Sequence, residues 1–250
     1  MNDILLFFSW KYEGDWYRIF KAIEEKEKVD YKELARIKNC IKDNYLTILD
    51  KNYPIGLRNV TNPPFVLYYR GDVTLLNKRG IAFIGCRKNS EYGEIMINKL
   101  IKPIGRKYTI VSGLAKGIDG LSHKYCLENE IKTIAVLGNG LDYYYPSVNK
   151  ELQNLIKEKG LLISEYPSFV RPKKHHFPMR NRIIAGLSKA IVVIECKRQS
   201  GSMISVEHGL NLGLDIFCVP SRANEDSGCN YLIKNGAKLV ECASDILEDL

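Results

Sequence analysis

The sequence predicts an α/β protein built on a doubly wound, mostly parallel sheet. After Gly80, short apolar runs of strand length alternate with amphipathic stretches of helix length. The runs are apolar along their whole length, as in parallel strands that are covered on both faces. Most of the loops that follow these runs are rich in glycine and serine and lead into a stretch of helical spacing.

Composition limits the class of protein before any motif is considered. The chain has 250 residues, 45% of them hydrophobic, which is enough for a sizeable core, and a net charge of +8 that permits an acidic partner. Its seven cysteines are widely spaced without a C-x-x-C pair, which argues against a disulfide framework or a zinc site and is typical of a reducing compartment. The apolar run 4–8 is too short for a signal or a membrane span. We expect a cytoplasmic protein without membrane, metal or cofactor.

Two domains are expected. Residues 1–50 predict a small helical module, because apolar residues such as Ile19, Phe20 and Ile23 recur at helical spacing. A connector rich in proline and turns begins at Lys51 and contains one short strand at 65–69. The second domain is therefore expected to span 51–250.

The second domain carries the alternation. Its apolar runs lie at 81–84, 109–111, 133–137, 161–163, 190–194, 216–219 and 238–240. Amphipathic stretches separate them, for example 94–107 with Leu100 and Ile104, and a later stripe with Leu152 and Ile156. Strands and helices in this order predict βαβ units.

Ligands of such sheets bind outside the carboxyl ends of the strands, so the loops there are the candidate site. These loops are 85–90, 112–119, 138–142, 164–182 and 199–202. Glycine allows the backbone to approach an anion closely, and a helix N-terminus offers free N–H groups. Neither the P-loop nor a complete G-x-G-x-x-G pattern occurs, and no hydrolase or zinc-protease signature is present. A chain of phosphates fits several such loops on one edge better than one phosphate does.

The strongest signal is the segment 171–182, which we call the basic segment. Its cations and two histidines surround a single aromatic residue, Phe177, and no Asp or Glu occurs between Tyr166 and Ile194. Cations without local counter-charges attract phosphates, and an aromatic ring among them can stack on a base. A solvated charged loop would have the same composition, but the position after a predicted strand favours binding.

Catalytic candidates are few. His123 and His208 lie on predicted helices and are interpreted as structural. Asp119 follows a glycine turn and is expected to cap a helix or to hold a loop. Glu165 and Glu195 end strands near the basic segment, where ion pairs with Arg180 or Arg182 are the simpler interpretation than acid catalysis.

From about Asn52 to Leu247 the sequence resembles the DNA-processing protein A family, also called Smf. The resemblance depends on ordered motifs: Gly85-Cys86-Arg87, Ser112-Gly113-Leu114-Ala115-Lys116-Gly117-Ile118-Asp119, Gly138-Asn139-Gly140-Leu141-Asp142 with Tyr145-Pro146, Phe177-Pro178-Met179-Arg180-Asn181-Arg182, and Ser200-Gly201-Ser202. It implies an extended Rossmann-like domain that binds single-stranded DNA without sequence preference. It also implies a homodimer without enzymatic activity or cofactor, which protects DNA in natural transformation (competence) and helps to load the RecA recombinase during recombination.

The resemblance assigns roles to individual residues. The implied DNA-binding residues are Arg87, Lys174, Phe177, Arg180, Asn181 and Arg182, with Gly140, Ser200, Gly201 and Ser202 as weaker additions. The implied dimer or recombinase surface contains Ile233, Lys234 and Leu239. Two positions depart from the family pattern, since Cys86 replaces the usual serine and Glu207 adds a negative charge.

A second function stays open at this point, namely an enzyme or sensor of a small nucleotide-derived ligand. Related Rossmann-like families that use such ligands carry a Pro-Gly-Gly-x-Gly-Thr loop with a downstream glutamate. Here residues 199–202 read Gln-Ser-Gly-Ser, with Glu207 following, which is only a partial match.

Overall fold

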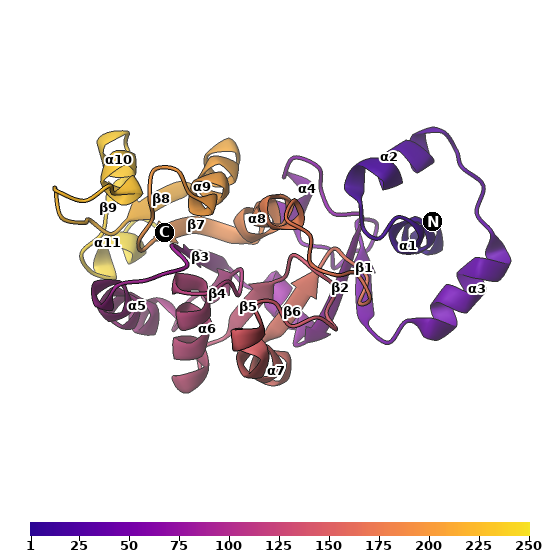
Figure 1. Ribbon diagram of the computed structural model, residues 1–250, viewed down its shortest axis with the longest axis horizontal. Helices are drawn as coiled ribbons and strands as arrows, with labels where there is room; N and C mark the ends of the chain where they lie inside the picture. Colours follow the sequence, from indigo (N-terminus) through magenta and orange to yellow (C-terminus); the bar gives the residue numbers. More distant parts are fainter.

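In the computed structural model, which describes residues 1–250, one nine-stranded sheet runs through the molecule in the order β1-β2-β6-β5-β4-β3-β7-β8-β9 (Figure 1). The strands are β1 (Asn44–Thr47), β2 (Val66–Gly71), β3 (Gly80–Ile84), β4 (Thr109–Ser112), β5 (Thr133–Val136), β6 (Leu161–Ser164), β7 (Ser188–Val193), β8 (Asp215–Cys218) and β9 (Lys238–Leu239). The β1–β2 and β2–β6 pairs are antiparallel, and every other pair is parallel. The predicted mostly parallel sheet is confirmed.

Helices cover both faces of the sheet. They are α1 (Asn2–Lys11), α2 (Trp16–Glu24), α3 (Tyr31–Cys40), α4 (Ile55–Arg58), α5 (Glu91–Ile104), α6 (Ile118–Glu128), α7 (Lys150–Lys159), α8 (His176–Gly186), α9 (Gly201–Asn211), α10 (Gly228–Lys234) and α11 (Ser244–Leu247), with short 3₁₀ helices at Val73–Asn77 and Ser147–Asn149. Alternate residues of β3 point to opposite faces of the sheet. On one face, Ala82 and Ile84 pack with α4, α8, α9 and α10. On the other face, Ile81 and Phe83 pack with α5, α6 and α11. None of these helices is long and apolar enough to cross a membrane.

The order of the strands creates a switch point beside β3. The chain adds β4, β5 and β6 on one side of β3 and then returns to place β7 on the other side. The loops that follow β3 and β7 therefore leave the sheet in opposite directions and open a crevice between them. Several loops with predicted binding residues converge on this crevice.

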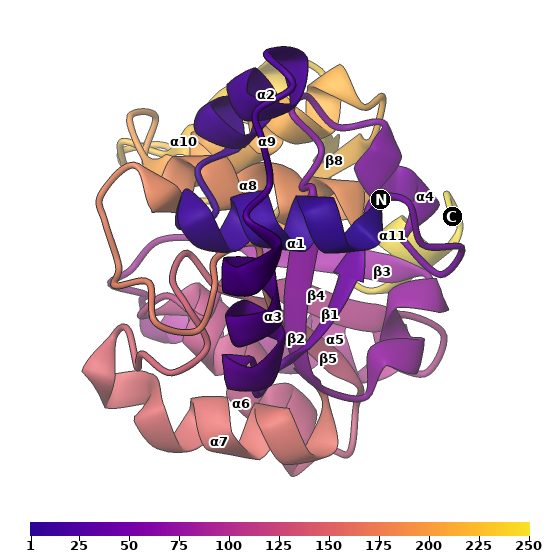
Figure 2. The ribbon, with the colours of Figure 1, turned by 90° about the vertical axis from the view of Figure 1, so that its right-hand side faces the viewer.

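The N-terminal helices pack against the β1–β2 end of the sheet (Figures 1 and 2). Side chains of α1, α2 and α3 share one buried cluster with Tyr68 of β2, Ala135 of β5 and Leu162 of β6. Asp15 and Asp30 cap α2 and α3 by accepting hydrogen bonds from backbone N–H groups of the first turn. The proposed domain boundary after residue 50 stays a prediction.

Residues 1–50, predicted to form a small helical module, contain the helices α1, α2 and α3 and also a strand at 44–47 that was not predicted. Residues 44–47 form β1, whose register with β2 pairs Tyr45 with Tyr68 and Thr47 with Val66. Aromatic and β-branched residues favour a strand here, and the partner strand lies about 20 residues further along the chain. The apolar runs of the second domain all form strands, with ends that differ by one or two residues from those expected.

Candidate nucleic-acid interface

A cleft of about 760 Å³ lies at the β3/β7 switch point, and we call it the β3/β7 cleft. The loop after β3, the start of α8 and the loop between β7 and α9 supply most of its lining. The predicted site residues that line it are Arg87, Lys174, Phe177, Arg180, Asn181, Ser200, Gly201 and Ser202. The fold therefore brings together all but two of the DNA-binding residues that the sequence resemblance implies.

The loop after β3 is held from both neighbouring elements. Cys86 N–H donates to Glu195 O at 2.7 Å, and the Glu195 carboxylate accepts the Ser90 N–H at 2.9 Å. From the other side, Ile118 N–H donates to Cys86 O at 3.2 Å. Arg87 lies on this fixed loop, is exposed, and has no acidic partner. Its guanidinium is free to bind an anion.

Neighbouring lysines of the basic segment differ in their partners. Lys173 forms an ion pair with Glu13 of the N-terminal module, with Nζ and Oε2 2.7 Å apart. Lys174 is exposed, has no acidic partner and lines the cleft. The next turn is fixed by His176, whose ring stacks on Tyr166 at 4.0 Å between centroids. Its Nδ1 lies 3.2 Å from Gly138 O, and burial lowers the pKa of His176 to about 4, so the neutral ring donates from Nδ1.

Phe177 is half-buried with its ring over the loop after β5. A Cβ atom at Gly138 would lie 2.8 Å from Phe177 Cδ1, so only glycine leaves room for the ring in this position. The Tyr145 ring lies beside it, with centroids 5.1 Å apart. Because Phe177 lines the cleft together with Arg87 and Lys174, its ring is available to a ligand bound there.

Arg180 is buried under the cleft. Its Nη1 donates to Gly113 O at 2.6 Å and also to Val136 O, so the guanidinium joins α8 to the ends of β4 and β5. Burial lowers the pKa of Arg180 to about 10, which leaves it charged at neutral pH. Asp119 accepts the Gly113 N–H at 3.2 Å and holds this loop, one of the two roles expected for it. Nη2 of Arg180 has no acceptor within the protein and is the part left for a ligand.

The loop after β7 completes the cleft with hydroxyl and backbone groups. Ser202 Oγ donates to Gly85 O at 2.9 Å and fixes the start of α9 to the loop after β3. Asn181 Nδ2 donates to Gly201 O at 3.3 Å and does the same from α8. The helix α9 begins at Gly201, which lines the cleft, and a helix N-terminus favours an anion. Asn181 and Ser202 thus position the loops in addition to lining the cleft.

Two predicted residues lie elsewhere. Arg182 is buried and pairs with both carboxylate oxygens of Glu165, at 2.6 and 2.7 Å, which confirms the ion pair expected between these residues. Gly140 N–H donates to Val170 O at 2.8 Å, and a Cβ there would lie 2.2 Å from Pro167 O. Both residues maintain the loops around the cleft, and their predicted contacts with a ligand have no support from this geometry.

Three of the residues considered for catalysis, Glu165, Glu195 and His123, are engaged in structure. Glu195 accepts the Ser90 hydroxyl as well as its N–H, and it does not pair with Arg180 or Arg182. His123 is fully buried, its Nδ1 lies 2.7 Å from Thr133 Oγ1, and burial lowers its pKa to about 3. Of the acidic residues, Asp119 alone lines the cleft. Glu207 lies outside it, in a hollow towards β8 and α10, so its charge does not oppose a ligand in the cleft.

Sequence reasoning missed three residues that line the cleft, Lys88, Lys197 and Tyr145. Both lysines are exposed without an acidic partner. The available signal was the position of each lysine four residues after the end of a strand. Tyr145 was noticed only as part of the Tyr145-Pro146 motif.

The predicted dimer or recombinase residues lie at the far end of the sheet (Figure 1). Ile233 and Lys234 are on α10, and Leu239 is on the edge strand β9, where the residue is 46% exposed. Ile233 is partly buried against the core, whereas Lys234 is exposed, and the role of these residues in a dimer or a recombinase contact stays a prediction.

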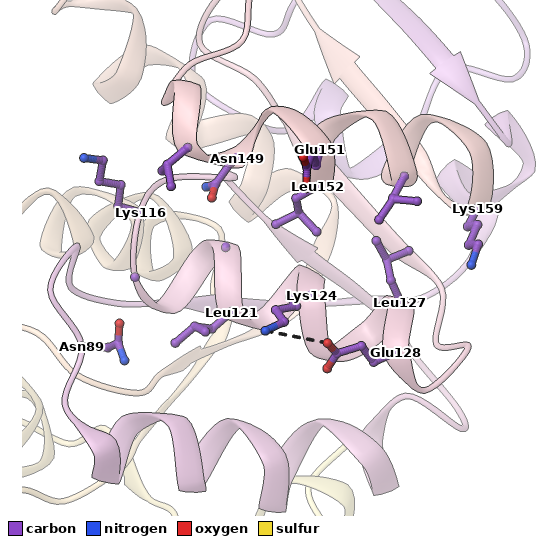
Figure 3. A pocket seen from close by; sticks show the side chains of 14 residues that line it. Asn89, Lys116, Leu121, Lys124, Leu127, Glu128, Asn149, Glu151, Leu152 and Lys159 are labelled. Atoms are coloured by element: carbon purple, nitrogen blue, oxygen red, sulfur yellow. Dashed lines mark ion pairs between the residues drawn. The ribbon is translucent and has the colours of Figure 1, made fainter.

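A second hollow of about 690 Å³ lies between α6 and α7 (Figure 3). Leucines of both helices form its floor, Lys124 pairs with Glu128 on its rim, and Lys116 marks the end nearest to the β3/β7 cleft. None of the predicted site residues lines it. We call it the α6/α7 groove.

Comparison with known proteins gives consistent matches. The family model for DNA recombination-mediator protein A matches residues 44–250. The DNA processing protein DprA of Streptococcus pneumoniae is 38% identical, and the match covers 93% of this chain and 92% of that protein. The X-ray structure of the S. pneumoniae protein has a TM-score of 0.84 at 40% identity, covering 94% of this chain and 80% of that one. A structure of DNA processing protein A from Helicobacter pylori, which concerns the single-stranded DNA binding mode of that protein, has a TM-score of 0.75 at 28% identity and covers 84% and 96%.

Proposed function

The chain belongs to the DNA recombination-mediator protein A family, and from this premise we propose that it binds single-stranded DNA along the β3/β7 cleft. One observation carries the proposal most directly. The accessible ring of Phe177 lies in a cleft whose exposed cations, Arg87 and Lys174, have no acidic partners. A ring that shares a cleft with free cations matches a polymer with stackable bases and a charged backbone.

Single strands fit this arrangement better than a duplex. In a duplex the faces of the bases are covered by their neighbours, whereas an unpaired base can leave the stack and lie on Phe177. The cations of the cleft include exposed lysines, which contact phosphates as point charges and carry no base code. Binding is therefore expected to be independent of sequence.

The role is binding rather than catalysis. The H. pylori relative is described for its single-stranded DNA binding, and in this chain Glu165 and Glu195 are committed to Arg182 and Ser90. We propose that the protein protects single strands during transformation and recombination and helps to load RecA on them. A homodimer through the surface that contains Ile233, Lys234 and Leu239 belongs to the same proposal, as does a cytoplasmic location.

The test is a binding titration at several salt concentrations with a labelled single strand, the matching duplex, and a mononucleotide competitor. We expect the single strand to bind most tightly, with an affinity that falls as a power of the salt concentration because counterions are released. Preferential binding of the duplex would contradict the proposal. Displacement of the single strand by low concentrations of mononucleotide would favour a small nucleotide-derived ligand instead.

A further inference from the structure

The function proposed for the β3/β7 cleft leaves Tyr145 without a role. This residue follows β5, on a different loop from Phe177, and is 43% exposed. The two rings have centroids 5.1 Å apart and planes inclined by 33°, so they form a nearly continuous aromatic surface. A base stacked on Phe177 alone would leave the Tyr145 part of this surface uncovered.

A small pocket of about 70 Å³ adjoins the cleft at these rings. Tyr145, Phe177, Arg87 and Arg180 line both hollows, which makes the surface continuous from one to the other. The small pocket adds Lys116, which does not line the β3/β7 cleft. A strand that leaves the cleft across the two rings therefore reaches Lys116 next.

Lys116 is placed to receive a phosphate. It is exposed and has no acidic partner. Its loop is fixed against the Arg87 loop, because Gly117 has a φ of +76° and a Cβ at that position would lie 2.3 Å from Cys86 O. Figure 3 draws the Lys116 side chain pointing away from the leucines of the α6/α7 groove. Arg87 and Lys116 are thus free cations on two neighbouring loops.

Beyond Lys116 the surface changes character. The α6/α7 groove is lined by aliphatic side chains such as Leu121, Leu152 and Leu155, with no aromatic ring for a base. Its lysine Lys124 lies 3.8 Å from a carboxylate oxygen of Glu128. The arrangement that suits a nucleotide therefore ends with Tyr145 and Lys116.

We infer that Tyr145 and Lys116 form a second nucleotide subsite next to Phe177, in which the Tyr145 ring stacks on a base and Lys116 binds a neighbouring phosphate. The inference rests on the proposed binding of single-stranded DNA and extends the bound length by about one nucleotide. Its ligand is a nucleotide within a single strand, recognised by ring and charge without base-edge contacts.

The chain offers matched controls for both residues. Tyr144 is also partly exposed, but its hydroxyl donates to Asn154 Oδ1 at 3.0 Å, and Lys150 covers its ring at 5.2 Å. Lys124 is an exposed lysine of the adjacent helix that pairs with Glu128. Tyr144→Ala and Lys124→Ala should therefore bind as the unmodified protein does.

The experiment measures affinity for thymidine oligonucleotides of about 4 to about 16 nucleotides, the range of known site sizes. Tyr145→Ala should weaken binding of the longer strands about tenfold, the loss of one stacked base, and should weaken the shortest strand less. Lys116→Ala should weaken the longer strands about threefold and reduce the salt slope by about 1. Tyr145→Phe keeps the ring and should keep the affinity, and thermal unfolding of each variant checks that it is folded.

A double variant separates a direct contact from support of the neighbouring ring. If Tyr145 binds a base, Tyr145→Ala should weaken Phe177→Ala further, and a strand with a halogenated uracil should cross-link to Tyr145 under light. Two results would contradict the subsite and leave the proposed function intact. In the first, the double variant binds the strand with the same affinity as Phe177→Ala alone. In the second, Tyr145→Ala binds strands of every length with normal affinity, while Phe177→Ala binds them more weakly. If both Tyr145→Ala and Phe177→Ala bound single strands with normal affinity, the proposed function of the β3/β7 cleft would be contradicted.

Discussion

The two halves of the basic segment have the same kind of composition and opposite environments. In the first half, Lys174 is exposed and unpaired, and Phe177 keeps part of its ring free. In the second half, Arg180 and Arg182 are buried and donate to backbone carbonyls and to Glu165. Charge in a sequence motif thus divides into a part that is free to bind a ligand and a part that builds the support beneath it.

The largest expected effect is on the buried half. Arg182→Ala leaves the Glu165 carboxylate buried without its partner, which should reduce the free energy of unfolding by about 3–5 kcal/mol. Denaturant unfolding measures the change. The double variant Arg182→Met with Glu165→Gln removes both charges and should recover part of the loss. If Arg182→Ala were as stable as the unmodified protein, the second half of the basic segment would not have this supporting role.

A smaller effect is expected on binding by the exposed half. Phe177→Ala should weaken single-stranded DNA binding by about 1–3 kcal/mol through loss of a stacked base, while stability changes less. Phe169→Ala is the matched control, because Phe169 is also partly exposed but its ring packs against Trp10 at 4.7 Å. Fluorescence anisotropy with a labelled oligonucleotide measures both. Equal losses in the two variants would contradict a specific role of Phe177.

The neighbouring histidines His175 and His176 also differ in burial, and for the buried His176 this has a consequence for stability at low pH. The pKa of His176 is about 4 in the folded protein because the ring is buried, against an ordinary value of 6.5. Below pH 6.5 the unfolded chain therefore binds a proton that the folded protein does not, and stability falls as the pH falls towards 4. We expect His176 to contribute about 1 kcal/mol of the loss between pH 7 and about pH 5.5.

Denaturant unfolding at the two pH values measures this loss, and His176→Gln should reduce it. His175→Gln removes an exposed imidazole at the next position and is the control. An unchanged pH dependence in His176→Gln would mean that the buried ring is not the source.

Two neighbouring lysines provide the smallest effect and the sharpest comparison. Lys174→Ala should weaken binding about threefold and reduce the salt slope by about 1, because one phosphate contact is lost. Lys173→Ala breaks the ion pair with Glu13 and should leave the salt slope unchanged. A binding titration across salt concentrations distinguishes them. If Lys173→Ala reduced the salt slope more than Lys174→Ala did, the DNA strand would instead lie on the side of the N-terminal module.

Sequence predicts the sheet well because its signal is local. Buried parallel strands such as β3 and β7 are apolar throughout, and each can be recognised without knowledge of its neighbours. The strand β1 was missed because it is a four-residue edge strand whose register depends on β2. The meeting of the loops at one edge follows from strand direction alone, and it was predicted for that reason.

The candidate site is less predictable, because burial depends on packing between distant segments. The motif from Phe177 to Arg182 does not reveal that the side chain of Arg182 is directed towards Glu165. An ion pair between the two residues could be proposed only from their opposite charges. Gly140 resembles a phosphate-loop glycine and instead makes room for the chain at Pro167. Lys197 carries no motif at all, and only the β7 loop brings it to the cleft.

The guanidinium of Arg180 has a consequence for the energetics of association. By joining α8 to the ends of β4 and β5, it fixes the start of α8 beside the cleft before any ligand arrives. The protein then loses little conformational entropy on binding, and most of the ordering cost falls on the flexible strand. A preorganised, cationic surface of this kind favours association limited by electrostatic encounter, with differences between variants expressed mainly in the rate of dissociation.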